Sequence, residues 1–342
     1  MRCVVRDLSV RNCDAAATDR NRCTATMAAS ARSGQPVTRC RPRIHARPAR
    51  VAHLMSDDLS LRKHTSAASS RLRWRLWLTR AALTLVSIAA LAYAAAVGYM
   101  WVRQEQLLFA PDVLATDQGL KLDDDVHEVF VDVADAKLHA LHLRLPNPRG
   151  VVFYLHGNTG SVQRWFVDSD LYRRANFDLF MLDYRGYGKS SGRIESEAQL
   201  QADVRAAWQQ IAPLYAGKRR VIQGRSLGTA LAAQLSATVR PELTVLVSPY
   251  SSLEALIAEM YPWVPSFVLR YPLHTDRAVM QMRTPLLIVH GARDTFITLE
   301  HARRLASLKA DAQLVVVPDA GHGNIVDSAG YRNALRVPLE AP

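Results

Sequence analysis

A serine between two glycines is the first place in this chain where chemistry is expected. Ser226 stands in the sequence GRSLG (224–228), directly after the β-branched run RRVIQG and directly before a series of small helix-forming residues. A serine hydroxyl is a weak nucleophile at neutral pH, and it needs a neighbouring imidazole to accept its proton. A nucleophilic Ser226 therefore requires a histidine, and a carboxylate that holds the histidine in the correct tautomer.

Two later residues meet this requirement. Asp294 follows the apolar run PLLIVHG, and His322 follows the apolar run AQLVVVPD. Each of the three candidates thus stands at the end of an apolar run, and in open parallel sheets ligands bind beyond the carboxyl ends of the strands. The order Ser226, Asp294, His322 predicts a nucleophile, an orienting carboxylate and a general base that meet at one edge of a sheet. Asp319 is a rival orienter, but it shares a loop with His322 and would reach its ring less readily.

Backbone amides for a developing oxyanion are expected at two places. The sequence YLHGNTG (154–160) ends an apolar run, and its glycine allows an amide to turn toward Ser226. Leu227 begins the helix that follows the serine, where free N–H groups face developing negative charge. We therefore predict that the backbone N–H groups of Asn158 and Leu227 form the oxyanion hole. His156 is interpreted as a structural residue of the turn.

The elements that must position these residues alternate between strands and helices. Two alternating segments, 127–133 and 137–145, predict an antiparallel pair. Continuous apolar runs predict parallel strands that are covered on both faces. We expect an eight-stranded, mostly parallel sheet with helices on both faces. The parallel runs lie at 151–157, 177–184, 219–224, 243–249, 285–291 and 312–319, and helical patterns at 161–174, 196–214, 227–238, 298–308 and 325–336.

One long segment interrupts this alternation between the sixth and seventh strands. Residues 250–283 contain three prolines and many Trp, Tyr, Phe and Leu residues. Insertions of this kind over strand ends commonly form lids and substrate walls, although simple helix packing is an equally valid interpretation. We expect a short lid insertion here.

These motifs together resemble the α/β-hydrolase superfamily over about residues 125–336. The sequences YLHGNTG, DYRGYGKSSG, GRSLGTA, VHGARDTFI and GHGN are similar to those of serine aminopeptidase S33-like and BEM46-type hydrolases, including the ABHD13-like and ABHD17-like branch. The resemblance implies that Ser226 is the nucleophile, His322 the general base and acid, and Asp294 its orienter. It implies ester, thioester or amide hydrolysis without choosing among them. Thr229 departs from the glycine expected in relatives, and Asp183 and Arg185 in DYRGYGKSSG are interpreted as parts of a structural turn.

The first 80 residues of the chain differ from the rest in charge and composition. Residues 1–80 carry 17 Lys and Arg against 5 Asp and Glu, which equals the net charge of +12, while residues 81–342 carry 26 of each. We expect residues 1–72 to be disordered, with Met27 or Met55 as alternative starts. The four cysteines all precede residue 41 and are expected to be unpaired.

A transmembrane helix is expected at residues 73–103. The 22 residues from Ala81 to Val102 contain no charge and no proline, and as a helix they extend about 33 Å, enough to cross a ~30 Å hydrocarbon layer. Four arginines precede this span and one closely follows it, which favours a cytoplasmic N-terminus and an extracytoplasmic, periplasmic or luminal body. A cleaved signal peptide and a buried core helix are the alternatives. We expect a linker at 104–124 and the hydrolase domain at 125–342.

Composition also restricts the ligands. The neutral body gives no support for nucleic-acid binding, and no phosphate-binding or metal-binding motif is present, so no cofactor or metal is expected. The sequence therefore favours a membrane-anchored serine hydrolase of a lipid-like or small-molecule acyl substrate. Two alternatives remain, a peptidase that cleaves amides and a catalytically silent interaction protein. The sequence does not indicate the oligomeric state.

Overall fold

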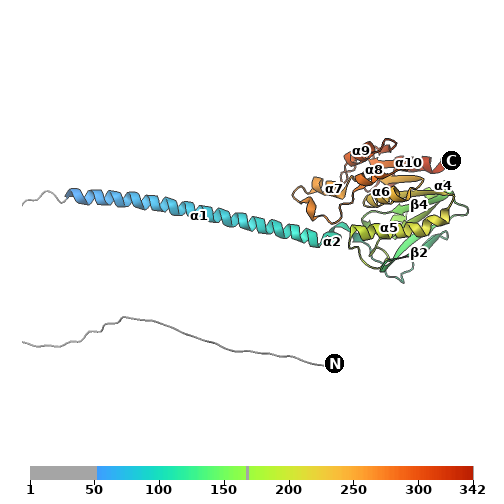
Figure 1. The fold of residues 1–342 in the computed structure, drawn as a ribbon, viewed down its shortest axis with the longest axis horizontal. Coiled ribbons are helices and arrows are strands. Elements are labelled where there is room, and N and C mark those ends of the chain that lie inside the picture. The colour runs from blue at the N-terminus through green and yellow to red at the C-terminus, as the bar shows by residue number, and fades with distance from the viewer. Residues whose placement is uncertain (1–51, 167–168, 342) are drawn as a thin grey trace, which may run out of the picture. The chain divides into compact units, whose positions relative to one another are not determined.

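The computed structural model describes residues 52–166 and 169–341. The chain divides into two units, Met1–Leu76 and Trp77–Pro342. The second unit contains the α/β domain (Figure 1, green to red). Residues 1–51, which include the alternative start at Met27, lie outside the described residues. Residues 52–72, where disorder is also expected, belong instead to the helix α1 (Ala52–Val102).

The α/β domain is built on one eight-stranded sheet, as the sequence predicts. Its spatial order is β10-β9-β8-β7-β4-β6-β3-β2. The pair β2 and β3 is antiparallel, β3 joins β6 in antiparallel register, and the remaining neighbours are parallel. The strands are β2 (Val126–Val133), β3 (Ala136–Leu143), β4 (Gly150–Leu155), β6 (Phe177–Leu182), β7 (Arg219–Arg225), β8 (Leu243–Val247), β9 (Leu286–Gly291) and β10 (Gln313–Val317).

Helices cover both faces of the sheet and create two cores. In β4, Val151, Phe153 and Leu155 belong to one core, whereas Val152 and Tyr154 belong to the other. This explains the continuous apolar runs, because every residue of such a strand is buried. The first core packs against α5 (Glu197–Ile211), α6 (Gly228–Val239), α8 (Thr275–Gln281) and α9 (Leu299–Ser307), and the second against α3 (Val162–Trp165), α4 (Ser169–Ala175) and α10 (Ala329–Glu340).

A long helix, α1 (Ala52–Val102), precedes the domain. Its segment Ser69–Val102 is long and apolar enough to cross a membrane, and no residue in its most apolar window is buried. Leu91, for example, is 71% exposed. This segment is therefore not a core helix of the domain, and it remains a candidate membrane anchor by length and composition.

The residues after α1 differ from the expected linker at 104–124. Residues 104–111 form α2 (Gln104–Leu108) and β1 (Ala110–Pro111), and β1 pairs in parallel with β5 (Thr159–Gly160). Phe109 is buried in the first core, with its ring edge-on to Tyr271 at 5.3 Å. The segment is too short to be read as an element from periodicity, and its contacts with the domain hold it in place.

The insertion at 250–283 contains α7 (Leu253–Met260), a 3₁₀ turn (Ser266–Val268) and α8. It contacts the segment that follows α1. Gln104 donates its side-chain amide to the carbonyl of Val268 at 3.0 Å and accepts from the amide of Arg270 at 2.6 Å. Tyr271 donates its hydroxyl to Glu105 at 2.8 Å. The insertion therefore attaches α2 to the domain.

Candidate active site

Ser226 lies on a sharp turn between β7 and α6. Its φ of +51° falls in the left-handed region, which is strained for a residue with a side chain. The turn requires close backbone approach, since a Cβ at Gly228 would lie 2.1 Å from the Leu155 carbonyl oxygen, and one at Gly224 would lie 2.3 Å from the Gly228 oxygen. The glycines on either side of the serine thus let the turn pack tightly and hold the hydroxyl above the sheet edge.

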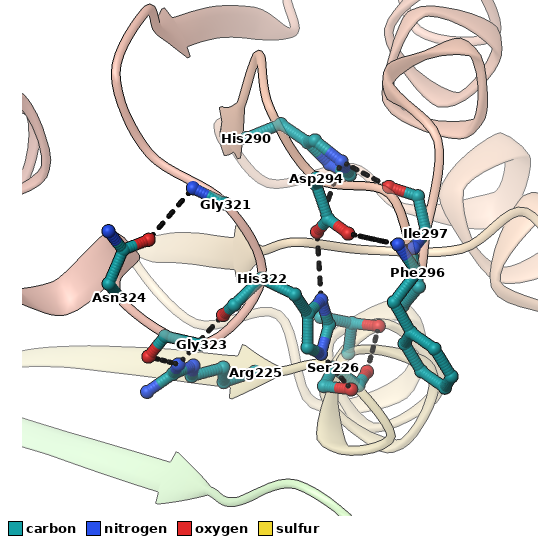
Figure 2. Close-up of polar contacts among 11 residues, drawn as sticks. Arg225, Ser226, His290, Asp294, Phe296, Ile297, Gly321, His322, Gly323 and Asn324 are labelled. Atoms are coloured by element: carbon teal, nitrogen blue, oxygen red, sulfur yellow. Dashed lines mark hydrogen bonds and ion pairs between the residues drawn. The ribbon is translucent and has the colours of Figure 1, made fainter.

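The three candidate residues form one chain of hydrogen bonds (Figure 2). The Ser226 hydroxyl lies 3.0 Å from Nε2 of His322. Nδ1 of the same ring lies 2.8 Å from Oδ2 of Asp294. The three side chains come from the loops after β7, β9 and β10, so the parallel sheet brings residues 96 positions apart within hydrogen-bonding distance.

Asp294 is held as a carboxylate. Its Oδ1 accepts from the amides of Phe296 at 3.0 Å and Ile297 at 2.8 Å. Burial raises the pKa of Asp294, but the hydrogen bond to His322 and the Ile297 amide lower it further, so this pKa lies below its ordinary value. An ionised Asp294 holds the proton of His322 on Nδ1 and leaves Nε2 free to accept a proton from Ser226.

Asp319, the alternative carboxylate for orienting His322, does not contact the His322 ring. Asp319 is on the surface with its side chain 83% exposed, and its carboxylate pairs with Arg293 at 2.8 Å. No hydrogen bond joins it to His322 within the described residues. The residues of the DYRGYGKSSG segment are structural contacts, as expected: Asp183 accepts from the amide of Val162 at 2.8 Å, and Arg185 pairs with Asp203 at 2.6 Å.

The two predicted oxyanion amides belong to the loop after β4 and to the turn that contains Ser226. Asn158 and Ser226 line the same cavity, and Leu227 follows the serine. In the part of the chain that the structure describes, neither the Asn158 nor the Leu227 amide donates a hydrogen bond to another backbone or side-chain group. Both amides are therefore available to a ligand oxygen.

The Asn158 loop is held by contacts that sequence reasoning missed. Its carbonyl accepts from the Tyr187 hydroxyl at 2.7 Å and from the Ala110 amide at 2.9 Å, and its side chain donates to the Leu108 carbonyl at 3.1 Å. The segment that follows α1 thus supports the predicted oxyanion loop directly. Tyr187, the second tyrosine of DYRGYG, is the sequence signal for this role, and the sequence alone does not say what it contacts.

Arg225 is a second residue that the sequence left without a role. It precedes Ser226, and one of its guanidinium nitrogens donates to the carbonyls of His322 at 3.0 Å and Gly323 at 3.1 Å. The guanidinium also stacks on the ring of Trp165, 4.9 Å from its centroid. Arg225 therefore connects the serine turn to the histidine loop, which Figure 2 shows beside His322.

A cavity of about 580 Å³ opens at Ser226 and His322. The described part of its wall is largely aromatic and apolar, with two arginines and one carboxylate. It is lined by Tyr154, Trp165, Tyr172, Leu179, Met181, Phe296, Val326 and Tyr331 among others, and the charged members are Arg164, Arg225 and Asp327. A cleft of this size and lining is typical of a site for an organic ligand.

The expected lid does not cover this cavity. Among the described lining residues, none comes from 250–283, and the wall is formed instead by the loop after β4, by α3, α4 and α10, and by Phe296. The expectation of a lid insertion is thus corrected, because no described lining residue belongs to 250–283, and its buried apolar residues, such as Leu253 and Tyr271, pack in the first core. Within the described residues, no group of three His, Cys, Asp or Glu side chains is placed to hold a metal ion.

The sequence of this chain is similar to a known protein family and to several known proteins. A family model described as serine aminopeptidase, S33, matches residues 146–275. An uncharacterised protein of Mycobacterium tuberculosis is 28% identical over 268 residues, which cover 75% of this chain and 94% of that protein. The human alpha/beta hydrolase domain-containing protein 17B is 27% identical over 197 residues, covering 56% of this chain and 66% of that protein.

Solved structures share the fold. An esterase of Pyrococcus furiosus superposes with a TM-score of 0.55 at 20% identity, covering 68% of this chain and 97% of that chain. A likeness at this identity concerns the fold and leaves the substrate open. Together with the family model and the related sequences, it supports an α/β-hydrolase similar to alpha/beta hydrolase domain-containing protein 17B, and supports a hydrolase.

Proposed function

We propose that this protein is a membrane-anchored serine hydrolase that cleaves an ester or thioester of an acyl chain. The observation that carries the proposal is the unbroken hydrogen-bond chain from Ser226 through His322 to Asp294, with the serine on a strained turn that opens into an apolar cavity. In this proposal Ser226 is the nucleophile, His322 the general base and acid, and Asp294 the group that orients His322.

The reaction proceeds in two halves. Ser226 Oγ bonds to the acyl carbon while its proton passes to Nε2 of His322, and the amides of Asn158 and Leu227 stabilise the oxyanion. His322 then gives that proton to the leaving alcohol or thiol as its bond to carbon breaks. In the second half, His322 takes a proton from water, the hydroxide attacks the acyl-serine, and Ser226 Oγ recovers the proton as the acid is released.

The lining of the cleft favours binding of an acyl chain over binding of a peptide amino terminus. Among the described residues that line the cleft, Arg164 and Arg225 are cations and Asp327 is the one carboxylate. An aminopeptidase has to hold the positive α-amino group of its substrate, and a wall with two cations and one anion repels that group. The aromatic and aliphatic wall, by contrast, gains from burial of methylene groups at about 0.8 kcal/mol each.

A fluorophosphonate probe tests the nucleophile. We expect the wild-type protein to be labelled, and Ser226→Ala not to be labelled while its circular dichroism spectrum is unchanged. Absence of labelling of the folded wild-type protein would favour the interaction protein without activity. A panel of p-nitrophenyl esters of rising chain length, run beside aminoacyl anilides, tests the substrate class. Faster turnover of the anilides would overturn the preference for esters.

We further propose that the apolar segment of α1 anchors the protein, with the N-terminus in the cytoplasm and the catalytic domain on the opposite side. The support is the exposed apolar span and the arginines that precede it, Arg71, Arg73, Arg75 and Arg80. Carbonate extraction of native membranes tests the anchor, because an anchored chain stays in the pellet whereas a chain with a cleaved signal peptide is released. Protease protection of the catalytic domain in sealed vesicles tests the orientation.

A further inference from the structure

Large apolar side chains are exposed at one end of the insertion. Residues 260–267, called here the insertion tip, have the sequence MYPWVPSF and carry no charge. Trp263 is 49% exposed and Phe267 is 85% exposed. Met260 and Tyr261 are exposed as well. Four exposed large apolar residues within eight positions mark an interaction surface, because soluble domains rarely leave such side chains together in water.

The insertion tip runs beside the last part of α1. The Tyr93 hydroxyl donates to the Trp263 carbonyl at 3.0 Å, and Gln104 donates to the Val268 carbonyl at 3.0 Å. These two contacts place the tip alongside the helix between Tyr93 and Gln104. The tip therefore lies next to the apolar span and not beyond its end.

The length of the span decides what surrounds the tip. Between Arg80 and Tyr93 there are 12 uncharged residues, 81–92, which extend only about 18 Å as a helix. A hydrocarbon layer is about 30 Å thick, so it has to continue past Tyr93 by about 12 Å, roughly eight residues. The helix beside the insertion tip thus lies within the apolar layer, and the tip lies there with it.

Charged residues mark where the apolar layer ends. Arg103, Arg193 and Arg270 line a cavity of about 660 Å³ together with Val102, the last residue of α1. The guanidinium of Arg270 also lies over the ring of Trp101, 5.5 Å from its centroid. Arginine and tryptophan at the end of a span are typical of the headgroup region, where both find polar partners.

We infer that the insertion tip enters the bilayer beside α1 and forms a second membrane contact of the hydrolase domain. The inference rests on the proposed anchor and goes beyond it, since an anchor alone requires no part of the domain to touch lipid. The occupant of the exposed apolar surface is the acyl-chain region of the bilayer. Two contacts prevent the domain from rotating freely about α1, so the domain keeps one face toward the membrane.

Depth-dependent quenching of a fluorescent probe tests this inference on the full chain. The four native cysteines, all before residue 41, are replaced by serine, and one cysteine is introduced by Trp263→Cys and labelled with a nitrobenzoxadiazole probe. The protein is reconstituted into phosphatidylcholine vesicles with and without lipids that carry a nitroxide on the acyl chain. Leu91→Cys reports on the span itself. Val337→Cys, at an apolar side chain on α10 that is 65% exposed, is the matched control outside the membrane.

We expect the nitroxide lipids to quench the probes at 263 and 91 strongly and to leave the probe at 337 unchanged. Quenching at 91 without quenching at 263 would overturn the inference and leave the anchor intact. Absence of quenching at both positions would reject the anchor itself. Phe267→Cys provides a second probe of the tip whose side chain is almost fully exposed, so its replacement leaves packing intact, and it is expected to give the same result as position 263.

Discussion

At the residue scale, the site depends on a carboxylate that keeps one tautomer of His322. Asp294 accepts from the His322 ring and from two backbone amides, so it stays ionised although it is buried. Removing the charge while keeping the shape separates the orienting role from packing. In Asp294→Asn, an amide N–H group faces Nδ1 of His322 in place of the carboxylate oxygen that accepts its proton. This favours the His322 tautomer with its proton on Nε2, which cannot accept a proton from Ser226.

We therefore expect Asp294→Asn to lower kcat by about 10⁴-fold, the size of the loss when this substitution is made in other serine hydrolase triads. The folded structure should be unchanged, since Asn retains a carbonyl for the amides of Phe296 and Ile297. Steady-state hydrolysis of a p-nitrophenyl ester measures the effect. Asp319→Asn is the control, because Asp319 is exposed and, among the described residues, pairs with Arg293 alone. A comparable loss in this variant would contradict the assignment.

Arg225 is expected to act through His322 and not on substrate. Its guanidinium holds the His322 and Gly323 carbonyls, and a small displacement of a catalytic group is costly. Arg225→Met should lower kcat by about 10²-fold with little change in KM for a neutral ester. Arg164→Met also removes a cation from the cleft but breaks no contact with the histidine loop, and should leave kcat unchanged. Equal losses of kcat in both variants would indicate a general charge effect instead.

At the element scale, the tight contact between β7, α6 and β4 determines whether the serine turn forms. A Cβ at position 228 would lie 2.1 Å from the Leu155 carbonyl oxygen, and both backbones are fixed by their own hydrogen bonds. Gly228→Ala is therefore expected to destabilise the fold by several kcal/mol, through overpacking and displacement of backbone. Urea unfolding measures the loss. Gly323→Ala is the control, since a Cβ there meets no atom within 4 Å.

The segment after α1 is a second element with a predicted consequence for catalysis. Because the Ala110 amide donates to the Asn158 carbonyl, Ala110→Pro removes this donor and loosens the predicted oxyanion loop. Loss of one aligned oxyanion donor costs about 10²-fold to 10³-fold in kcat, and we expect a decrease of up to that size. Ala115→Pro is the control, because among the described residues its amide donates no backbone hydrogen bond. An unchanged kcat in Ala110→Pro would show that β1 does not position the loop.

At the scale of the whole molecule, buried histidines make stability depend on pH. His142 is buried in the sheet with its Nε2 at 2.8 Å from the Tyr215 hydroxyl. Burial, assisted by the charges of Arg144 and His127, lowers the pKa of His142 from 6.5 to about 4. The unfolded chain therefore binds a proton at a higher pH than the folded one, so stability is full above pH 6.5 and falls as the pH decreases toward 4.

The lowered pKa of His142 corresponds to a decrease of up to about 3 kcal/mol in the free energy of unfolding as the pH falls from 6.5 to about 4. Urea unfolding in detergent at pH 7 and at pH 5 measures it, and His142→Gln should reduce the difference between the two pH values. Gln keeps a donor for Tyr215 and has no proton to gain. A difference that stays the same in His142→Gln would assign the pH dependence to other groups.

Several parts of this protein were determined by the sequence alone. Continuous apolar runs predict parallel strands covered on both faces, and two alternating segments predict an antiparallel pair, so the eight strands could be read from composition and periodicity. The triad candidates could be read as well, because Ser226, Asp294 and His322 each follow such a run, and parallel strands end at one edge. Local chemistry and short-range pattern are sufficient for these features.

Only the tertiary structure decided the rest. Residues 104–111 have no periodicity, and their role follows from hydrogen bonds to Asn158 and Val268, which lie about 50 and 160 positions away. The choice between Asp294 and Asp319 as the carboxylate that orients His322 followed from the structure, in which Asp294 contacts the His322 ring and Asp319 pairs with Arg293. The structure also shows that residues 250–283 contact α2 and do not line the cleft. Contacts between distant segments depend on how strands and loops are stacked in space, and no local pattern in the sequence encodes them.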